Sequence, residues 1–263
     1  DKKAKIDNEK CISCGACVYK CPFGAIADKS YILEAIKLLK ESENNSKYNV
    51  YAVVAPSIVS QFVQVRVEQV VSGLKHLGFF SVVEAALGAE KGFLTSSCCP
   101  AFVTYVRKAF PDLAQHVSHN LSPMAQIAKH IKRLDPGCKI VFVGPCIAKK
   151  MEQKWETVSP YIDCVITFEE LQALFDARDI DIASLPDEHL NNASYYGRIF
   201  ARSGGLASAV EQALREQGLY DLGDFRYKPV SCDGIRECRT ALLKASKGVL
   251  QENFIEGMAC ESG

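Results

Sequence analysis

Four cysteines near the start of the chain constrain its folding more than any other feature. They are spaced Cys11-x-x-Cys14-x-x-Cys17-x-x-x-Cys21, and Pro22 follows directly. This spacing brings three thiolates into one tight loop and a fourth close behind it, as a [4Fe-4S] cubane requires. A zinc site is disfavoured because the residues after Cys21 offer no second cysteine or histidine pair. Two readings of Cys21 stay open: it closes this cluster, or it serves another cluster held by an upstream motif.

Composition supports metal ligation over a disulfide scaffold. Twelve cysteines occur in a chain of 263 residues that is 48% hydrophobic, whereas disulfide scaffolds are typical of short secreted chains. The 31 basic and 31 acidic residues balance, which favours neither nucleic acid nor an anionic membrane as a partner. We expect no membrane-spanning helix, because the longest apolar runs have the length of strands. The start, Asp1-Lys2-Lys3, lacks a signal region and a methionine, which is typical of a processed or trimmed product.

After the first cysteines, the apolar spacing predicts a helix over 30–40, and the polar run at 41–47 predicts a linker. Short apolar strands and amphipathic helices then alternate, which predicts an α/β fold with largely parallel sheet. Ligand sites in such folds lie in loops at the carboxyl ends of strands. The expected strands are Val50–Ala55, Ser81–Ala86, Gly92–Thr95, Lys139–Val143 and Cys164–Phe168. The expected helices are Val65–His76, Pro100–Ala109, Pro123–Arg133, Glu169–Ala177, Leu206–Gln217 and Ile235–Ser246.

Two of these helices carry start signals with a physical cause. Ser122 is placed to cap a helix that begins with Pro123. Thr167 and Glu170 have the spacing of a capping box.

Three further segments place cysteines beside glycine or proline, in loops that we expect to follow strands. They are Ser96–Pro100, Gly144–Glu152 and Glu256–Cys260. One buried cysteine at a strand end is a common structural feature, but three such loops can converge on one cofactor. Outside them, we interpret four cysteines as buried thiols and none of the histidines as a ligand. These cysteines are Cys138, Cys164, Cys232 and Cys238.

Taken in order, these motifs resemble the [FeFe]-hydrogenases over nearly the whole chain. The catalytic domain of that family carries three signatures, roughly T-S-C-C-P, P-C-x-x-K-x-x-E and E-x-M-x-C-x-x-x-C. The chain is similar to the first at Ser96–Pro100, matches the second at Pro145–Glu152 and matches the third at Glu256–Cys260. The resemblance implies a catalytic domain over 48–263 with mostly parallel sheets flanked by helices. A ferredoxin-like [4Fe-4S] segment over 1–30 and a helix with linker over 31–47 precede it.

The resemblance also implies the cofactor of that family, the H-cluster. In it, a cubane is joined through a cysteine sulfur to a diiron unit that carries carbon monoxide, cyanide and a bridging dithiolate. By resemblance, the cubane ligands here are Cys99, Cys146 and Cys260. Four residues are expected at the diiron site, with Lys149 and Ser57 as donors beside Pro56 and Met258.

A proton path follows from the same resemblance. Cys98 is expected to pass protons rather than to ligate iron, because the pKa of a thiol can be tuned near the working range. Ser118 and Glu152 are the further members of the path. Simpler readings stay open: Ser118 as a turn residue, Glu152 as a charge on a surface helix and Met258 as plain core.

The implied activity is the reversible reduction of protons to molecular hydrogen. A ferredoxin-like carrier is the implied electron partner, hydrogenase maturation proteins are further partners, and the cytoplasm is the expected location. Two rivals share the fold: a hydrogen or redox sensor, and a non-catalytic iron–sulfur protein like the hydrogenase-like factors of cluster assembly, which lack the diiron unit.

The chain departs from the family pattern in three places. The last cysteine of the third signature falls at position 264, beyond the sequence, and a helix of the family is missing between Glu90 and Lys91. Gly144, Met124 and Phe102 replace the methionine, glutamine and tryptophan of many members. Either the sequence omits segments that depend on the diiron unit for order, or the protein is a degenerate relative without that unit. We favour omitted segments, because the remaining motifs keep the family order.

Overall fold

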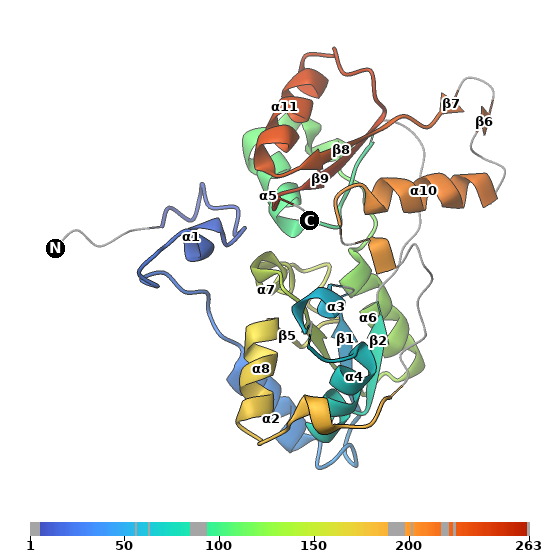
Figure 1. Ribbon diagram of the computed structural model, residues 1–263. Helices are drawn as coiled ribbons and strands as arrows, with labels where there is room; N and C mark the ends of the chain where they lie inside the picture. Colours follow the sequence, from blue (N-terminus) through green and yellow to red (C-terminus); the bar gives the residue numbers. More distant parts are fainter. Residues whose placement is uncertain are drawn as a thin grey trace.

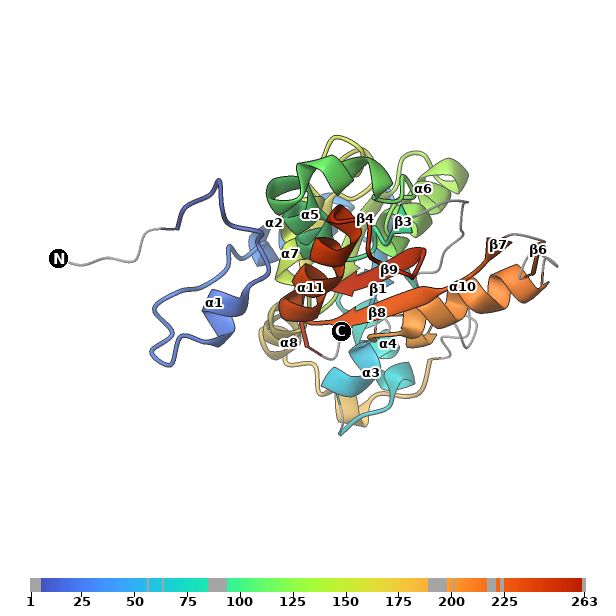
Figure 2. The ribbon, with the colours of Figure 1, turned by 90° about the horizontal axis from the view of Figure 1, so that it is seen from above.

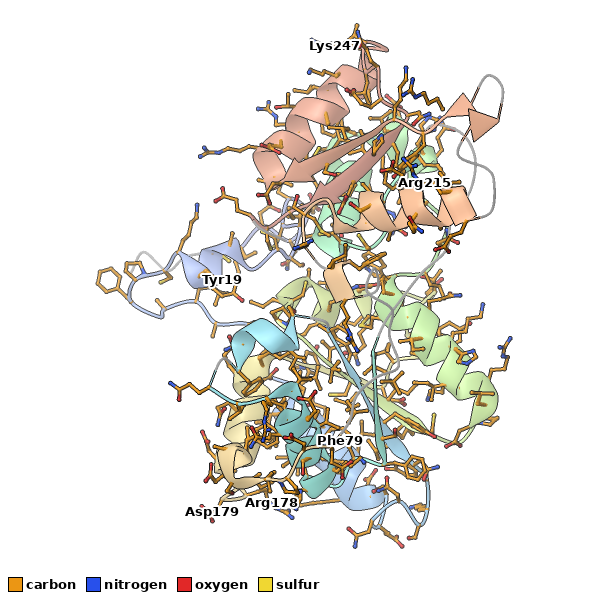
Figure 3. All side chains as sticks on the ribbon, turned by 45° about the vertical axis from the view of Figure 1, so that its right-hand side comes forward. Tyr19, Phe79, Arg178, Asp179, Arg215 and Lys247 are labelled. Carbon is orange, nitrogen blue, oxygen red and sulfur yellow. The ribbon has the colours of Figure 1, made fainter. Side chains whose placement is uncertain are left out.

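The computed structural model describes residues 6–55, 57–62, 64–84, 94–188, 198–200, 202–216, 221–222 and 225–261. These residues form a lower body around β1, an upper body around β9, and an N-terminal segment beside the junction of the two (Figure 1). Seen from above, the N-terminal segment again projects to one side (Figure 2). Arg178 and Asp179 lie at the far end of the lower body, and Lys247 lies at the far end of the upper body (Figure 3).

The lower body is built on a four-stranded parallel sheet in the order β2-β1-β4-β5. Its strands are buried and rich in valine and isoleucine, as is typical of parallel sheets that are covered on both faces. The strands are β1 (Val50–Val54), β2 (Ser81–Glu84), β4 (Lys139–Val143) and β5 (Cys164–Ile166). The helices of this body are α2 (Ile32–Glu41), α3 (Ile58–Gln61), α4 (Val67–His76), α6 (Pro123–Leu134), α7 (Ile147–Glu152) and α8 (Phe168–Asp176), with a 3-10 turn at Ile182–Ser184.

The upper body is built on a second parallel sheet in the order β3-β9-β8. Phe102, Leu242 and Ile255 are fully buried in its apolar core. The strands are β3 (Leu94–Thr95), β8 (Pro229–Asp233) and β9 (Phe254–Met258), and a small antiparallel pair is formed by β6 (Asp221–Leu222) and β7 (Phe225–Arg226). The helices are α5 (Pro100–Ala109), α10 (Gly205–Glu216) and α11 (Ile235–Ser246), with a 3-10 turn at Pro111–His116.

The predicted fold class is confirmed, since parallel sheets alternate with helices in both bodies. Both predicted start signals are confirmed as well. The hydroxyl of Ser122 accepts a hydrogen bond from the backbone N–H of Ala125 at 3.4 Å. Thr167 and Glu170 form the capping box, with contacts of 2.7 and 3.2 Å.

One expectation about the third signature is wrong. Glu256 was expected in a loop after a strand, but Glu256, Gly257 and Met258 lie within β9. Only Ala259 and Cys260 follow the strand. The three signature residues within β9 pair with Ser231, Cys232 and Asp233 of β8, and on the other side the N–H of Gly257 donates to Ser96 Oγ at 3.1 Å. The cysteine of the signature therefore leaves the sheet at a fixed point.

Within the described ranges, no helix is both long and apolar enough to cross a membrane.

Candidate metal centre

Three strands deliver cysteines to the junction between the two bodies. Cys98 and Cys99 follow β3, Cys146 follows β4, and Cys260 follows β9. Cys99 and Cys146 are the residues that precede the first turns of α5 and α7, and their backbones are nearly identical, with φ/ψ of −96°/106° and −95°/109°. Each body thus places a cysteine with the same backbone conformation just before a helix, at the junction between the bodies.

The electrostatic effects of these cysteines on one another's pKa indicate that they are neighbours. Burial raises the pKa of Cys146 to about 11, with Lys149 opposing the rise and the neighbouring Cys99 and Cys260 adding to it. Burial also raises the pKa of Cys260, and negative charge on Cys99 and on Cys14 raises it further. Cys14 belongs to the first cysteine motif, so the two groups of cysteines are neighbours.

The thiols are spaced more widely than the ligands of one ion. No three His, Cys, Asp or Glu side chains in the described part of the chain are close enough to hold a single metal ion. Cubane ligands bind different iron atoms and therefore stand apart around the cluster. Three convergent thiols fit a cubane in their donor chemistry.

The first cysteine motif forms an open loop that also suits a cubane. Its glycine, Gly15, has φ +77°, which lets the chain turn tightly between Cys14 and the short helix α1 (Ala16–Tyr19). Backbone N–H groups point at two of its sulfurs, from Ser13 to Cys11 at 3.4 Å and from Ala25 to Cys21 at 3.3 Å. The backbone N–H groups of Phe23 and Ala25 lower the pKa of Cys21. Thiolate is the form that binds iron.

Two contacts hold this loop against the junction. The ammonium group of Lys108, on α5, donates to the carbonyl oxygens of Asn8 and Cys11 at 2.8 and 2.9 Å. Gly15 packs so closely on α7 that an added Cβ atom would lie 2.8 Å from Cδ1 of Ile147. Because Ile147 follows Cys146, the first loop touches the second cysteine group directly.

Cys98 points into a small apolar cluster rather than into solvent. It is buried there with Phe200, Leu206 and Met258. Burial raises the pKa of its thiol to about 12, and the neighbouring Cys99 adds to the rise. The thiol therefore stays protonated at neutral pH, and in this state its pKa lies above the working range rather than near it. Met258 lies in the same cluster, as the resemblance implies.

A buried ion pair lies behind Cys98. The ammonium group of Lys149 donates to the backbone oxygen of Cys98 at 3.1 Å and to Glu152 Oε2 at 2.6 Å. Burial opposes its charge, but Glu152 and Cys146 outweigh that effect and raise the pKa of Lys149. Glu152 is only 1% exposed, so its reading as a surface helix charge is wrong.

Ser118 lies beside the cysteine loop. Its backbone N–H donates to the oxygen of Thr95 at 2.9 Å, and its hydroxyl accepts from the N–H of Asn120 at 3.3 Å. Ser97 donates to the oxygen of Asn120 at 2.8 Å, which ties the chain around Ser118 to the segment before Cys98. The reading of Ser118 as a turn residue and its role in proton transfer both stay predictions.

The remaining predicted residues lie at the end of β1. The N–H of Ala55 donates to the oxygen of Val143 at 2.8 Å, so β1 ends beside the strand that leads to Cys146. Ser57 is half-buried just after this point, at the start of α3. Pro56 and the junction of Glu90 with Lys91 lie outside the described residues.

Sequence reasoning missed two polar residues of the centre. Ser96 is buried, accepts from the N–H of Gly257 at 3.1 Å and contacts the thiol of Cys98. Glu256 is fully buried and accepts from three backbone N–H groups at the start of α10 and from Ser231 Oγ at 3.0 Å. Both residues lie within the signature segments Ser96–Pro100 and Glu256–Cys260. A polar residue inside a signature was the signal that could have identified them.

The four cysteines outside the signatures are buried, as predicted. Cys238 donates to the backbone oxygen of Met258 at 3.4 Å, and Cys164 donates to that of Tyr31 at 3.5 Å. These thiols therefore support the segments that carry the centre.

Comparison with known proteins gives two family matches. Residues 48–263 match the family described as "Iron only hydrogenase large subunit, C-terminal domain". Residues 4–27 match the "4Fe-4S binding domain".

Among curated proteins, the chain is 30% identical to the NADP-reducing hydrogenase subunit HndD of Solidesulfovibrio fructosivorans over 78% of the chain and 42% of the relative. It is 26% identical to iron hydrogenase 1 of Clostridium pasteurianum over 92% of the chain and 53% of the relative. It is also 35% identical to the cytosolic Fe-S cluster assembly factor NAR1 of Kluyveromyces lactis, over 38% of the chain and 21% of the relative. The chain thus spans about half the length, or less, of these relatives.

Among solved structures, an apo form of the [FeFe]-hydrogenase HydA1 from Chlamydomonas reinhardtii aligns with a TM-score of 0.65. The alignment has 20% identity and covers 88% of the chain and 82% of that structure. At this identity the likeness concerns the fold.

Proposed function

Because the chain belongs to the iron-only hydrogenase family, we propose that it interconverts protons, electrons and molecular hydrogen. Electrons come from a ferredoxin-like carrier and enter through a cluster on Cys11, Cys14, Cys17 and Cys21. Residues 1–30 form the electron-entry segment, 31–47 connect it, and 48–263 form the catalytic domain. We also propose a cytoplasmic location and dependence on maturation proteins.

The observation that carries this proposal is the buried ammonium group of Lys149 next to the buried thiol of Cys98. A site that held only a cubane needs thiolates and has no use for either group. A buried charge is costly unless it serves a partner. Two of the three N–H donors of Lys149 have acceptors in the described structure, Cys98 and Glu152, which leaves one for an anionic ligand.

The residues present fit three of the four cysteine positions of the family cofactor, since the fourth falls at position 264, outside the given sequence. Cys99, Cys146 and Cys260 would hold the cubane, and Lys149, Ser57, Pro56 and Met258 would surround the diiron unit. When bound, that unit supplies the chemistry of making and splitting hydrogen. Cys98 holds a proton at Sγ in a water-poor pocket, and Glu152 and Ser118 are the proposed route onward.

The cluster-assembly relatives favour a second candidate, a non-catalytic iron–sulfur protein. An infrared spectrum separates the two. The protein is matured anaerobically with a diiron source, and the region of metal-bound carbonyl and cyanide stretches is recorded. Sharp bands support the hydrogenase. A blank spectrum, with cubane iron present by analysis, overturns it in favour of the assembly-type candidate.

Cys98→Ala is expected to lower hydrogen turnover by a factor of about 10² to 10⁴, because it removes a positioned proton donor. Iron content should not change, since Cys98 is not a ligand in this proposal. Cys138→Ala is the matched control, because it removes a buried thiol from the lower body and should keep most of the turnover. Turnover is measured as hydrogen evolved from reduced methyl viologen; near-normal activity of Cys98→Ala contradicts the proton role.

A further inference from the structure

α7 carries two buried lysines in succession. Lys149 faces the metal centre, as described above. Neighbouring residues on a helix point about 100° apart, and Lys150 accordingly leads to a different part of the molecule, the segment that joins the first cysteine motif to α2. Lys150 is also buried, with its side chain 6% exposed.

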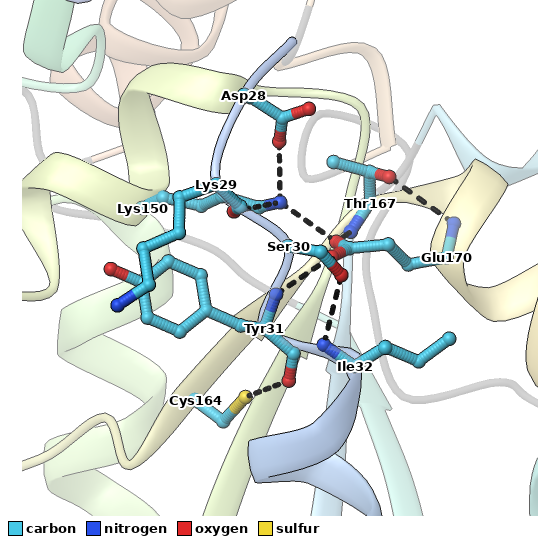
Figure 4. A network of polar contacts seen from close by, with 9 residues as sticks. All are labelled: Asp28, Lys29, Ser30, Tyr31, Ile32, Lys150, Cys164, Thr167 and Glu170. Atoms are coloured by element: carbon cyan, nitrogen blue, oxygen red, sulfur yellow. Dashed lines mark hydrogen bonds and ion pairs between the residues drawn. The ribbon is translucent and has the colours of Figure 1, made fainter.

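The ammonium group of Lys150 contacts three oxygen acceptors, one for each of its N–H donors. They are Asp28 Oδ2 at 2.5 Å, the backbone oxygen of Lys29 at 3.0 Å and Glu170 Oε2 at 2.8 Å (Figure 4). Asp28 and Lys29 belong to the joining segment, and Glu170 belongs to α8. One buried charge therefore ties the joining segment to two helices of the lower body.

Glu170 completes the attachment from the other side. Its Oε1 accepts from the hydroxyl of Ser30 at 2.6 Å and from the N–H of Tyr31 at 2.8 Å (Figure 4). Burial opposes the charge of this carboxylate, but the hydrogen bonds from Lys150 and Ser30 outweigh it and lower its pKa. The ring of Tyr31 lies against three lysines, with Lys29 at 5.0 Å and Lys150 and Lys154 at 5.7 Å.

We propose that Lys150, Asp28 and Glu170 form a clamp that positions the first cluster relative to the second. The proposal rests on the proposed function, because it presumes a cluster in each cysteine group. Cys21 lies seven positions before Asp28, and Cys146 lies four positions before Lys150. The clamp thus joins the chain just after one cluster to the helix that begins at a ligand of the other.

The clamp has a functional consequence because electron tunnelling falls steeply with distance. The contacts described above between the first loop and the junction are the packing of Gly15 on Ile147 and the exposed bonds of Lys108. Neither is a buried charge network. We therefore assign the fixed spacing of the two clusters to Lys150 and its partners, which act as positioning residues rather than catalytic ones.

The test uses the iron-loaded protein and two variants, Lys150→Met and Asp28→Asn. The first readout is the magnetic coupling between the two reduced clusters by electron paramagnetic resonance. We expect Lys150→Met to weaken and broaden the coupling with iron content unchanged. Asp28→Asn keeps the ion pair of Lys150 with Glu170, so it should weaken the magnetic coupling less than Lys150→Met does. If Lys150→Met fails to fold, the result for Asp28→Asn decides the test.

Hydrogen exchange of the Tyr31 amide gives a second readout. We expect the rate to rise by about tenfold or more in Lys150→Met, because local opening becomes easier. Lys154→Met is the matched control, since it removes an exposed lysine from the same ring, and it should change neither readout. Wild-type-like coupling in both test variants overturns the clamp, even if exchange is faster. Absence of a second cluster in the wild-type protein instead counts against the proposed function.

Discussion

Lys149→Met is expected to lower the free energy of unfolding by about 3–5 kcal/mol, the usual result of breaking a buried ion pair by removing one partner. The side chains of Lys149 and Glu152 are 10% and 2% exposed, and their contact is 2.6 Å. The variant leaves the Glu152 carboxylate buried without its counter-charge. The same change also removes the donor to the backbone oxygen of Cys98.

A double variant separates the loss of the pair from the loss of lysine packing. Lys149→Met with Glu152→Gln replaces both charges by neutral groups of similar size, and it should recover most of the stability. Lys154→Met, one turn later and exposed, should stay within about 0.5 kcal/mol of the wild type. Anaerobic urea denaturation followed by circular dichroism measures all three. A loss below about 1 kcal/mol in the single variant would show that Glu152 finds another partner.

In the proposed function, the pair serves the site as well as stability. Lys149 is held where it approaches Cys98, and Glu152 fixes its position from the next turn of α7. Catalytic constellations depend on such support, because small displacements of a donor weaken its action. The second signature thus places the proposed ligand Cys146, the proposed donor Lys149 and the residue that orients Lys149, Glu152, within seven positions.

Local signals explain why some elements could be predicted to the residue. α5 and α11 have the predicted bounds because Pro100 and Gly234 mark their starts and their apolar spacing is helical. The Ser122 cap and the Thr167 box are likewise short-range patterns. Such signals need no knowledge of the rest of the chain.

The second sheet could not be predicted, because two of its strands lack strand-like sequences. β8 begins with Pro229 and ends in Asp233, and β9 contains Glu256 and Gly257. Charged residues and glycine are disfavoured in strands. The fold tolerates Glu256 because the N–H groups at the start of α10 and the hydroxyl of Ser231 satisfy its carboxylate.

In the site, too, some features could be predicted from sequence motifs and others depend on tertiary contacts. The motif resemblance indicated Cys98, Lys149 and Met258 as one group, and the structure brings them together. The pairing of Lys149 with Glu152 and the attachment of Lys150 to Asp28 depend on tertiary contacts. The sequence alone does not distinguish a buried lysine from an exposed one. The burial of Lys149 and Lys150, on which their contacts depend, therefore could not be predicted.

Gly257→Ala is expected to lower the free energy of unfolding by about 1–3 kcal/mol through overpacking. A Cβ atom at this position would lie 2.3 Å from two ring atoms of Phe102, which is fully buried. The strand must therefore shift, and with it Met258 and Cys260. The variant should lose part of its iron, because Cys260, a proposed ligand of the second cluster, leaves its place.

Two companion variants make this result specific. Gly137→Ala is the matched control, since no atom lies within 4 Å of its added Cβ, and it should keep both stability and iron. Phe102→Leu combined with Gly257→Ala opens space above the strand and should restore iron content in part. Urea denaturation and iron analysis measure both effects. Full iron content in the single variant would mean that Cys260 keeps its position when β9 moves, and that the close packing of Phe102 on Gly257 does not fix the ligand.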